Sequence, residues 1–480
     1  MFNFYIYSLN ILLNKYQMKT MTSMKRFLFL PILALLITSC NNNDEPMIDK
    51  PKTIVDLASE TSTLSDLVAA LKAADGDLVN VLSGSGPFTV LAPTNTAFET
   101  FLTANGFSDL SEVPTDVLAQ ILLNHVIDGN VSASDLEALG SGYTKTFADG
   151  AANQKMDLFF DTSNGVVFNG VAKVSSPDIE ASNGTIHIVD AVIGLPTIVT
   201  HAAANPALSS LVGALTSGGN TTFTDLLSTA GNFTVFAPDN AAFAAFTNPS
   251  DNDLNQILSN HVISGVAALS SDLTNSYVKT LATFGNTDSH LDLYINTDDG
   301  VTLNGKAKVT RADIIASNGV IHVVDEVIDL PTIVDFAVSN PTFENLVAAL
   351  TRSDLTFDFV SALSTPNGTS PAPFTVFAPT NDAFAGLLTE LGISSLNDID
   401  EPTLKATLNY HAVAGANVLA ANLSDGMTVS TLGGNITANV TGGATLTDAN
   451  GRVSNIILTD VQASNGVIHA IDKVILPPLN

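Results

Sequence analysis

The sequence predicts an α+β protein built from three tandem copies of one domain. The block F-T-V-L/F-A-P-T/D-N-x-A-F occurs three times, at Phe88–Phe98, Phe233–Phe243 and Phe374–Phe384. A second motif, A-S-N-G-x-I-H, follows each block, at Ala181–His187, Ala316–His322 and Ala463–His469. Asn183, Asn318 and Asn465 of this motif lie 135 and 147 residues apart, far above the roughly 20 to 50 residues of a solenoid repeat. Each copy is therefore expected to fold around its own core.

The copies are expected to follow one another without a flexible linker. The segment L-P-T-I-V occurs at Leu195–Val199 and Leu330–Val334, at the end of one copy and the start of the next. Here the chain should leave a strand, pass a proline and enter a helix with Thr197 or Thr332 as its N-cap. No glycine-, serine- or proline-rich stretch intervenes, so restricted motion between neighbours is expected. We place the domains at residues 51–195, 196–330 and 331–478.

An amphipathic helix is predicted near the start of each copy. Apolar residues recur at positions i, i+3, i+4 and i+7, which places them in one stripe along a helix. The stripe comprises Leu64, Leu67, Val68 and Leu71 in copy one, Leu208, Leu211, Val212 and Leu215 in copy two, and Phe343, Leu346, Val347 and Leu350 in copy three. Each helix should pack this stripe on the rest of its domain.

The motif block that follows predicts a buried strand ended by proline. Its asparagine should lie at a turn or helix cap, at Asn95, Asn240 and Asn381. A second helix should end near the histidine of L-x-N-H or N-Y-H, at His125, His261 and His411. The rest of each copy is β-rich. Its last strand is apolar on both faces, so we expect that strand to be covered on both sides.

The region ahead of the repeats has the order of a secretion signal. Lys25 and Arg26 precede an apolar run from Phe27 to Ile37, which is shorter than the roughly 20 residues of a membrane-spanning helix. The segment from Ile37 to Cys40 resembles the bacterial lipobox, in which the cysteine is acylated. Cys40 is also the one cysteine of the sequence. We predict a signal peptide at residues 1–40 and a lipid on Cys40, with Met18, Met21 or Met24 as alternative starts.

The polar residues 41–50 are expected to form a tether between the lipid and the first domain. In the lipoprotein class that this segment resembles, an aspartate after the cysteine goes with inner-membrane retention. Asn41 stands there instead. The sequence therefore favours an outer-membrane lipoprotein of the cell envelope, and leaves open which membrane face it occupies.

Composition excludes several functional classes. With 47 acidic and 18 basic residues the net charge is −29, which repels phosphate backbones and argues against nucleic acid as a partner. The mean hydropathy is +0.30, yet no long apolar segment follows Cys40, so this hydropathy is assigned to packed cores. The sequence holds no tryptophan, a residue on which carbohydrate-binding modules commonly stack sugars. Without a second cysteine, no intramolecular disulfide can contribute to stability.

Together, the motif block, the histidine element and the closing N-G-x-I-H strand resemble the fasciclin domain family, which includes periostin and beta-ig-h3. The resemblance covers about residues 51–478. It implies that each domain is a β-sandwich wedge of about seven strands with helices packed along one edge. It also implies adhesion and extracellular contacts rather than catalysis, without a cofactor or a metal.

Most histidines fall at repeat positions, and we interpret them as structural. The repeated residues assigned to the fold are His125, His261, His187, His322 and His469, with Asn183, Asn318 and Asn465 of the N-G turn. A metal site needs at least three converging ligands, and buried polar groups are normally hydrogen-bonded. The sequence contains no H-E-x-x-H, no G-x-S-x-G and no glycine-rich phosphate loop, so no catalytic residue is assigned.

Candidate adhesion residues follow from the family resemblance. In animal fasciclin-domain proteins an acidic–apolar pair before the N-G turn lies within proposed integrin-binding peptides, and a Y-H element has been proposed as a second site. The matching residues here are Asp178, Ile179, Asp313, Ile314, Asp460, Val461, Tyr410 and His411. Asn124 and Asn260 replace the tyrosine in the first two copies. The alternative interpretation is that each aspartate caps a turn and each apolar neighbour fills the core.

These observations lead to two functional hypotheses. The first is a lipid-anchored envelope adhesion protein whose three domains bind a surface protein, matrix or polysaccharide through many weak contacts, with the membrane as a further partner through Cys40. The alternative is an envelope binding module for a small ligand, lipid or glycan, which predicts a concave apolar pocket in at least one domain. An enzyme is not expected.

Overall fold

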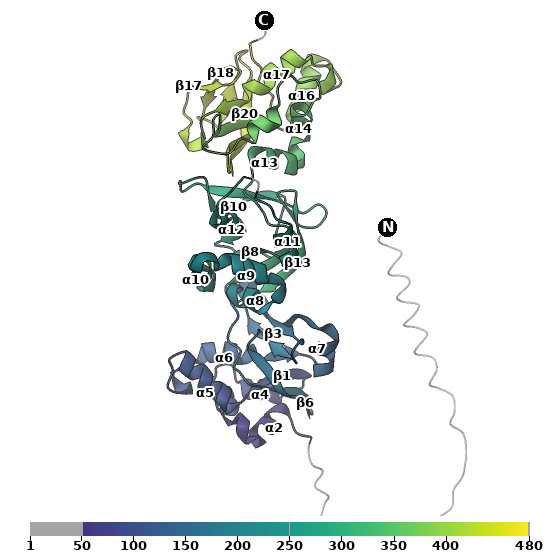
Figure 1. Ribbon diagram of the computed structural model, residues 1–480, viewed down its shortest axis with the longest axis vertical. Coiled ribbons are helices and arrows are strands. Elements are labelled where there is room, and N and C mark those ends of the chain that lie inside the picture. The colour runs from purple at the N-terminus through teal and green to yellow at the C-terminus, as the bar shows by residue number, and fades with distance from the viewer. Residues whose placement is uncertain (1–50, 249, 479–480) are drawn as a thin grey trace, which may run out of the picture. The chain divides into compact units, whose positions relative to one another are not determined.

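The computed structural model describes residues 51–248 and 250–478. The predicted signal peptide, Cys40 and the tether lie outside these described residues. From Pro51 onward the chain forms one compact unit. Within it the same arrangement of helices and strands occurs three times, and the colours of Figure 1 separate the copies in chain order. The predicted α+β class is confirmed.

Within the described residues each domain contains a seven-stranded sheet. The strands of domain 1 are β1 (Phe88–Pro93), β2 (Val126–Asp128), β3 (Ser141–Asp149), β4 (Lys155–Asp161), β5 (Val167–Phe168), β6 (Ala172–Ala181) and β7 (Gly184–Val189). Those of domain 2 are β8 (Phe233–Pro238), β9 (Val262–Ser264), β10 (Ser276–Thr283), β11 (His290–Asn296), β12 (Thr302–Leu303), β13 (Ala307–Ile315) and β14 (Gly319–Val324). Those of domain 3 are β15 (Phe374–Pro379), β16 (Ala412–Ala414), β17 (Met427–Thr431), β18 (Gly434–Asn439), β19 (Thr445–Thr447), β20 (Val453–Ala463) and β21 (Gly466–Ile471).

The helices lie mainly before the strand that carries the motif block and directly after it. In domain 1 they are α2 (Ile54–Glu60), α3 (Ser65–Ala73), α4 (Leu78–Ser83), α5 (Asn95–Ala104), α6 (Thr115–Leu123) and α7 (Ala133–Leu139). In domain 2 they are α8 (Ile198–Ala204), α9 (Ser209–Leu215), α10 (Thr222–Ser228), α11 (Asn240–Ala245) and α12 (Leu254–Ser259). In domain 3 they are α13 (Ile333–Ser339), α14 (Glu344–Leu350), α15 (Phe359–Leu363), α16 (Asn381–Leu391) and α17 (Glu401–Tyr410).

The two motifs of each copy pair with each other in the sheet. The motif-block strands β1, β8 and β15 run parallel to the closing strands β7, β14 and β21, with Phe88 opposite Gly184, Phe233 opposite Gly319 and Phe374 opposite Gly466. On its other side each motif strand pairs antiparallel with a short strand, which is β2, β9 or β16. In domain 1 the sheet closes into a barrel because Ile127 of β2 pairs with Thr146 of β3. The parallel pair is therefore the centre of each domain.

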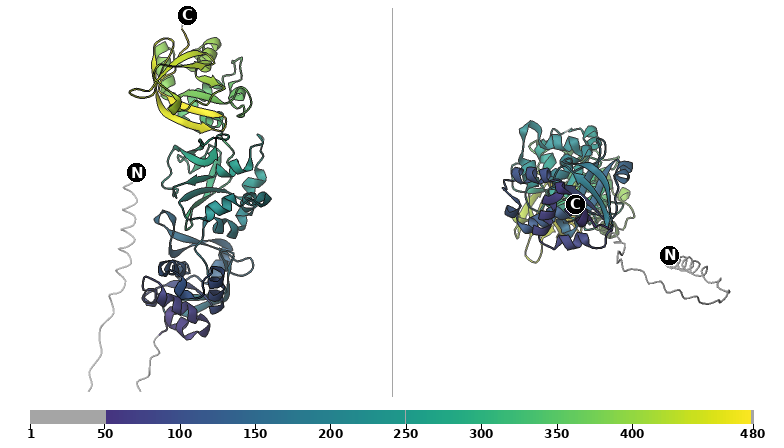
Figure 2. Two further views of the ribbon diagram at one scale, coloured as in Figure 1. Left: turned by 90° about the vertical axis from the view of Figure 1, so that its left-hand side faces the viewer. Right: turned by 90° about the horizontal axis from the view of Figure 1, so that it is seen from below.

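Each domain has two cores, one on either side of this central pair. The first lies between sheet and helices and contains the predicted stripe of α3, where Leu67, Val68 and Leu71 are buried. The second lies inside the curved sheet, where Leu158, Phe168 and their equivalents are buried. The closing strand separates the two cores, so its burial on both faces is confirmed. Figure 2 shows the strands and helices from two further sides.

The helix starts are capped as predicted in one place and differently in another. Thr197 and Thr332 cap α8 and α13, each with a capping box. The motif asparagines, in contrast, do not cap their own helices, because Thr94, Asp239 and Thr380 take that position. Each asparagine instead accepts a hydrogen bond from a backbone N–H in the first turn of the stripe helix, a helix without an N-cap side chain of its own. The donors are Asp66, Ser210 and Asn345.

Among the described residues no single helix has the length and hydropathy to cross a membrane. One strongly bent pair, Ile198–Ala204 with Pro206–Leu215, meets the criteria of length and composition only when taken together.

Candidate functional site

The asparagine of the N-G turn joins three segments of each domain. Its side-chain oxygen accepts from the first N–H of the entry helix, at 2.9 Å in domain 1 and 3.0 Å in domains 2 and 3. Its side-chain nitrogen donates to two backbone carbonyls, one near the end of α4, α10 or α15 and one just beyond that helix, at distances of 2.7 to 3.0 Å. Asn183, Asn318 and Asn465 thus hold the entry helix, the helix end and the closing hairpin together.

The glycine after this asparagine is required by close packing against the motif strand. A Cβ atom on Gly184, Gly319 or Gly466 would lie 2.0, 2.4 or 2.2 Å from the carbonyl oxygen of the opposing phenylalanine. Real Cβ atoms do not approach so closely, and the carbonyl belongs to backbone that cannot move aside. The N-G pair therefore serves the fold by bringing β7, β14 and β21 against their parallel neighbours.

The histidine of the closing strand is buried and hydrogen-bonded at both ring nitrogens. In domain 1 the Nδ1 atom of His187 accepts from the N–H of Asp178 at 3.1 Å, and Nε2 lies 2.8 Å from the carbonyl of Val131. Since Nδ1 accepts, the proton is assigned to Nε2. His322 and His469 repeat both contacts. Burial lowers the pKa of His322 and His469, so the neutral form is favoured.

The histidine just after α6, α12 or α17 uses the opposite tautomer. The Nδ1 atom of His125 lies 2.8 Å from the carbonyl of Ile121, and Nε2 accepts from the N–H of Ile193 at 2.9 Å. His261 and His411 make the same two contacts. Burial lowers the pKa of His125, His261 and His411 to about 4. Each ring joins the end of a helix to the segment that follows the closing strand.

The candidate adhesion aspartates occupy a bulge in the strand before the N-G turn. Asp178, Asp313 and Asp460 have φ values of 56°, 61° and 59°, a left-handed conformation that aspartate tolerates better than most residues. Each carboxylate accepts a hydrogen bond from a backbone N–H in the segment that follows β2, β9 or β16, at 2.7 to 2.9 Å. The donors are Ala133, Ser270 and Ala420. Each aspartate therefore has a capping contact within its own domain.

The apolar neighbours of these aspartates face inward. Ile314 and Val461 are 1% and 2% exposed, and Ile179 packs against the core of domain 1. Tyr410 is fully buried, donates its hydroxyl to the carbonyl of Asn435 at 2.6 Å and accepts from the N–H of Ala449. The eight residues thus do not form one surface in this structure, and their part in adhesion stays a prediction.

Among the described residues no three histidine, aspartate or glutamate side chains are grouped so that they could hold a metal ion. The shared geometry consists of buried turns, caps and histidine contacts.

The comparison with protein families matches this repeated geometry. The fasciclin domain model matches residues 62–196, 206–331 and 341–477. The chain belongs to the fasciclin domain family. Its membership in this family, with periostin and ig-h3 among its relatives, supports a general adhesion-type role.

The relatives of this fasciclin protein span distant organisms. Protein sll1483 of Synechocystis is 42% identical over 145 residues, which are 30% of this chain and 74% of that protein. Human periostin is 26% identical over 88% of this chain, which spans 47% of periostin's own length. Among solved structures, a FAS1 domain pair from the insect cell adhesion molecule fasciclin I matches 56% of this chain over 98% of its own length. The sequence identity is 20% and the TM-score is 0.36.

Neighbouring fasciclin domains are joined by a buried aspartate that the sequence interpretation missed. Asp157 of β4 accepts from the N–H of Ile315 in domain 2 at 2.6 Å and from the Lys145 ammonium at 2.7 Å. The second junction repeats this arrangement with Asp292, the N–H of Gln462 and Lys279, at the same distances. Burial raises the pKa of both aspartates, while the lysine and the backbone N–H oppose that rise.

A tyrosine beside each aspartate completes the junction. The ring of Tyr143 packs against His201, and its hydroxyl accepts from the Asn205 side chain at 3.3 Å. Tyr277 packs against Phe336 and accepts from Asn340 at 3.0 Å. The signal for these residues is present in the sequence, because Y-x-K-T occurs in copies one and two and is absent from copy three.

Proposed function

We propose that this chain is a lipid-anchored cell-envelope adhesion protein that makes multivalent contacts through its three fasciclin domains. The observation that carries the proposal is the presence of three fasciclin domains in one chain, behind a segment with the pattern of a lipoprotein signal. Linked copies raise the effective concentration of each further contact, so weak individual sites give firm attachment when the partner presents its sites repeatedly.

The proposed partner is a surface protein, matrix component or polysaccharide. The repeated motif residues are engaged in caps, turns and buried histidine contacts within their own domains. We therefore assign partner binding chiefly to exposed residues that differ between the copies. The strongly acidic composition favours partners that are neutral, basic or bridged by cations over nucleic acid.

Serial domain deletion tests the multivalent part of the proposal. Cells that carry the full chain, each two-domain deletion or each single-domain deletion are compared for attachment to other cells and to coated surfaces. Attachment should fall in graded steps as domains are removed. Unchanged attachment after removal of all three domains would overturn the proposal, and loss confined to one deletion would replace avidity by a single binding domain.

A separate experiment tests the anchor and the location. Mass spectrometry of the mature protein should show a chain that begins at an acylated Cys40, and the Cys40→Ser variant should be released from the membrane fraction. Protease treatment of whole cells should remove the domains if they face outward. A chain that is protected in intact cells would direct the contacts to the periplasm instead.

The alternative function, a binding module for a small ligand, is favoured by one observation. Domain 3 contains an apolar cavity of the kind that this hypothesis requires.

A further inference from the structure

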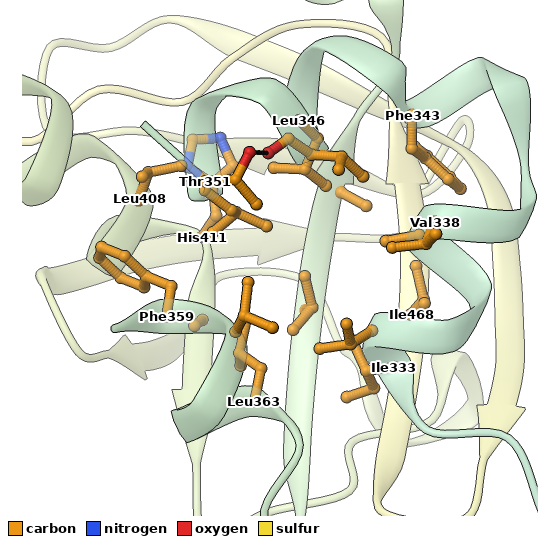
Figure 3. A pocket seen from close by; sticks show the side chains of 18 residues that line it. Ile333, Val338, Phe343, Leu346, Thr351, Phe359, Leu363, Leu408, His411 and Ile468 are labelled. Carbon is orange, nitrogen blue, oxygen red and sulfur yellow. Dashed lines mark hydrogen bonds between the residues drawn. The ribbon is translucent and has the colours of Figure 1, made fainter. Parts of the chain in front are cut away.

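Domain 3 contains a cavity within its helical core, and Figure 3 shows the side chains around it. Its volume is about 120 Å³. The walls come from α13, α14, α15 and the end of α17, and the floor comes from β15 with its neighbours β21 and β16. Ile333, Phe343, Leu346, Phe359, Leu363 and Ile468 are among the apolar side chains that line it.

The corresponding region of domain 2 is almost filled. There the cavity between the equivalent helices measures about 20 Å³. A nearby cavity in the helical core of domain 1 also measures about 20 Å³. The enlargement therefore belongs to domain 3 and is not a general property of the fold.

One side chain on the floor of the cavity accounts for part of this difference. Val376 of β15 pairs with Ala412, whereas the equivalent residues Val90 and Val235 pair with Val126 and Val262. Ala412 lines the cavity of domain 3, and Val262 lines the small cavity of domain 2. An alanine at this position withdraws two methyl groups from the cavity, and close-packed neighbours refill such space only partly.

The polar side chains that line the cavity leave no free hydrogen-bond donor for a ligand. Both ring nitrogens of His411 are engaged, Nδ1 with the carbonyl of Thr407 and Nε2 with the N–H of Ile475. The hydroxyl of Thr351 donates to the carbonyl of Val347 at 2.8 Å. A ligand that carried a charge or a hydrogen-bond acceptor would lose its water contacts in this cavity without replacement.

Size and access set the remaining limits on the occupant. An apolar cavity of about 150 Å³ in another protein stays dry and takes up benzene, so one of this volume suits a single aromatic ring or a short branched alkyl group. Val338, which is 66% exposed, and the exposed Thr351 lie at the rim, so the cavity reaches the surface between α13 and α14.

We infer that domain 3 holds a binding site for a small uncharged apolar ligand about the size of a benzene ring, and that domains 1 and 2 lack it. This site goes beyond the adhesion role, because it uses buried core residues of one domain rather than exposed surfaces of all three. Its test does not depend on whether the protein mediates attachment.

The test uses residues 51–480, which form one compact unit, so that neither an acyl chain nor detergent can fill the cavity. Benzene is added up to saturation in water while methyl NMR spectra and thermal unfolding are recorded. We expect saturable shifts of methyl signals from Ile333, Leu346 and Ile468. The midpoint temperature of thermal unfolding of domain 3 should also rise. Pyridine, a ring of similar size with a hydrogen-bonding nitrogen, should bind at least tenfold more weakly.

Two matched variants locate the site. Ala412→Val installs the residue of the other copies and should weaken benzene binding at least tenfold while domain 3 remains folded. Val262→Ala should create benzene binding in domain 2, a gain that loss of folding cannot imitate. The inference is overturned if saturating benzene leaves the wild-type methyl signals unchanged, or if folded Ala412→Val binds benzene as tightly as wild type. It is also overturned if Ala412→Val does not fold and Val262→Ala gains no binding.

Discussion

The outward face of the sheet differs between the first two domains and the third. In domains 1 and 2 one cross-strand pair on this face is lysine with aspartate, Lys145 with Asp157 and Lys279 with Asp292. At the equivalent register in domain 3 the pair is Ser430 with Asn435. The neighbouring aromatic pairs, Tyr143 with Phe159 and Tyr277 with Tyr294, are replaced in domain 3 by Thr428 with Thr437.

This difference shows how little of the fold is needed to make one domain hold another. All three faces have the same strand pairing, yet only those of domains 1 and 2 present a buried carboxylate and a tyrosine to the next domain. On domain 3 the serine and asparagine hydrogen-bond to each other, and both are exposed. The face of domain 3 therefore keeps the strand pairing and lacks the groups that hold a neighbouring domain.

The largest expected effect is a difference in acid sensitivity between the two junctions. Burial lowers the pKa of His201 to about 4, whereas Phe336 holds the equivalent place at the second junction. Because the folded pKa lies below the unfolded value of 6.5, the unfolded chain takes up the proton first. The contribution of neutral His201 to the free energy of unfolding is therefore fully present above pH 6.5. It is lost as the pH falls towards 4, and the loss reaches up to about 3 kcal/mol.

Thermal unfolding between pH 7 and pH 4.5 checks this expectation. His201→Phe should remove part of the acid sensitivity of wild type, and Phe336→His should add acid sensitivity at the second junction. His125, His261 and His411 contribute equally to all variants, so their effects cancel in the comparison. Identical pH profiles for wild type and His201→Phe would contradict the assignment.

The next effect tests the buried aspartate. Asp292→Ala leaves the N–H of Gln462 without its acceptor and should destabilise the second junction by about 2 kcal/mol. Calorimetry of residues 51–480 should show that domain 3 of the variant unfolds at a lower temperature than in wild type. Its transition should also be better separated from that of domain 2. Asn435→Ala, at the same register of domain 3, should change stability by less than about 0.5 kcal/mol. Equal effects of the two substitutions would erase the distinction between the faces.

A smaller effect is expected from the tyrosine hydroxyls. Tyr277→Phe removes the bond from Asn340 at 3.0 Å and takes this partner from the side-chain nitrogen of a buried asparagine, which should cost about 1 kcal/mol. Tyr143→Phe removes a longer bond of 3.3 Å and should cost less. Chemical denaturation of the two variants measures both values. A larger loss for Tyr143→Phe would reverse the predicted order.

The smallest effect concerns the same ion pair placed in water. The double change Ser430→Lys and Asn435→Asp gives domain 3 the pair of its neighbours, on a face that is exposed within the described residues. Its stability should change by less than about 0.5 kcal/mol, since exposed ion pairs contribute little. A stabilisation of several times that amount, measured by denaturation, would show that the pair acts within its own sheet rather than through docking.

The sequence predicts the fold well because core and turn requirements leave local patterns. The α3 stripe, the caps at Thr197 and Thr332, and the doubly buried closing strand are all visible as periodicity or as turn chemistry. The motif asparagines show the limit of such reasoning. Asn95 caps a helix that lies about thirty residues earlier in the chain, and no local rule joins two segments that meet only in the folded domain.

The candidate site was harder to foresee for a related reason. Repetition draws attention to residues that all copies share, and here those residues satisfy buried hydrogen bonds inside each domain. The junction aspartates and the cavity instead arise where the copies differ, at Asn435 and at Ala412. Neither difference acquires a meaning until the strand register shows which positions are equivalent.

The hydrogen bonds that hold the N-G turn to the start of its domain affect how the domain bears a pulling force. In domain 2 the chain enters at Pro196, whose carbonyl accepts from the N–H of Ser317, two residues before β14. The chain leaves the domain beyond the far end of the same strand. A pull between the two ends of the domain is therefore directed along β14. The hydrogen bonds to β8 on one side and β13 on the other must then yield in shear, many at once, instead of opening one after another. If the chain is anchored and adhesive as proposed, this arrangement would let each domain resist the load that it transmits.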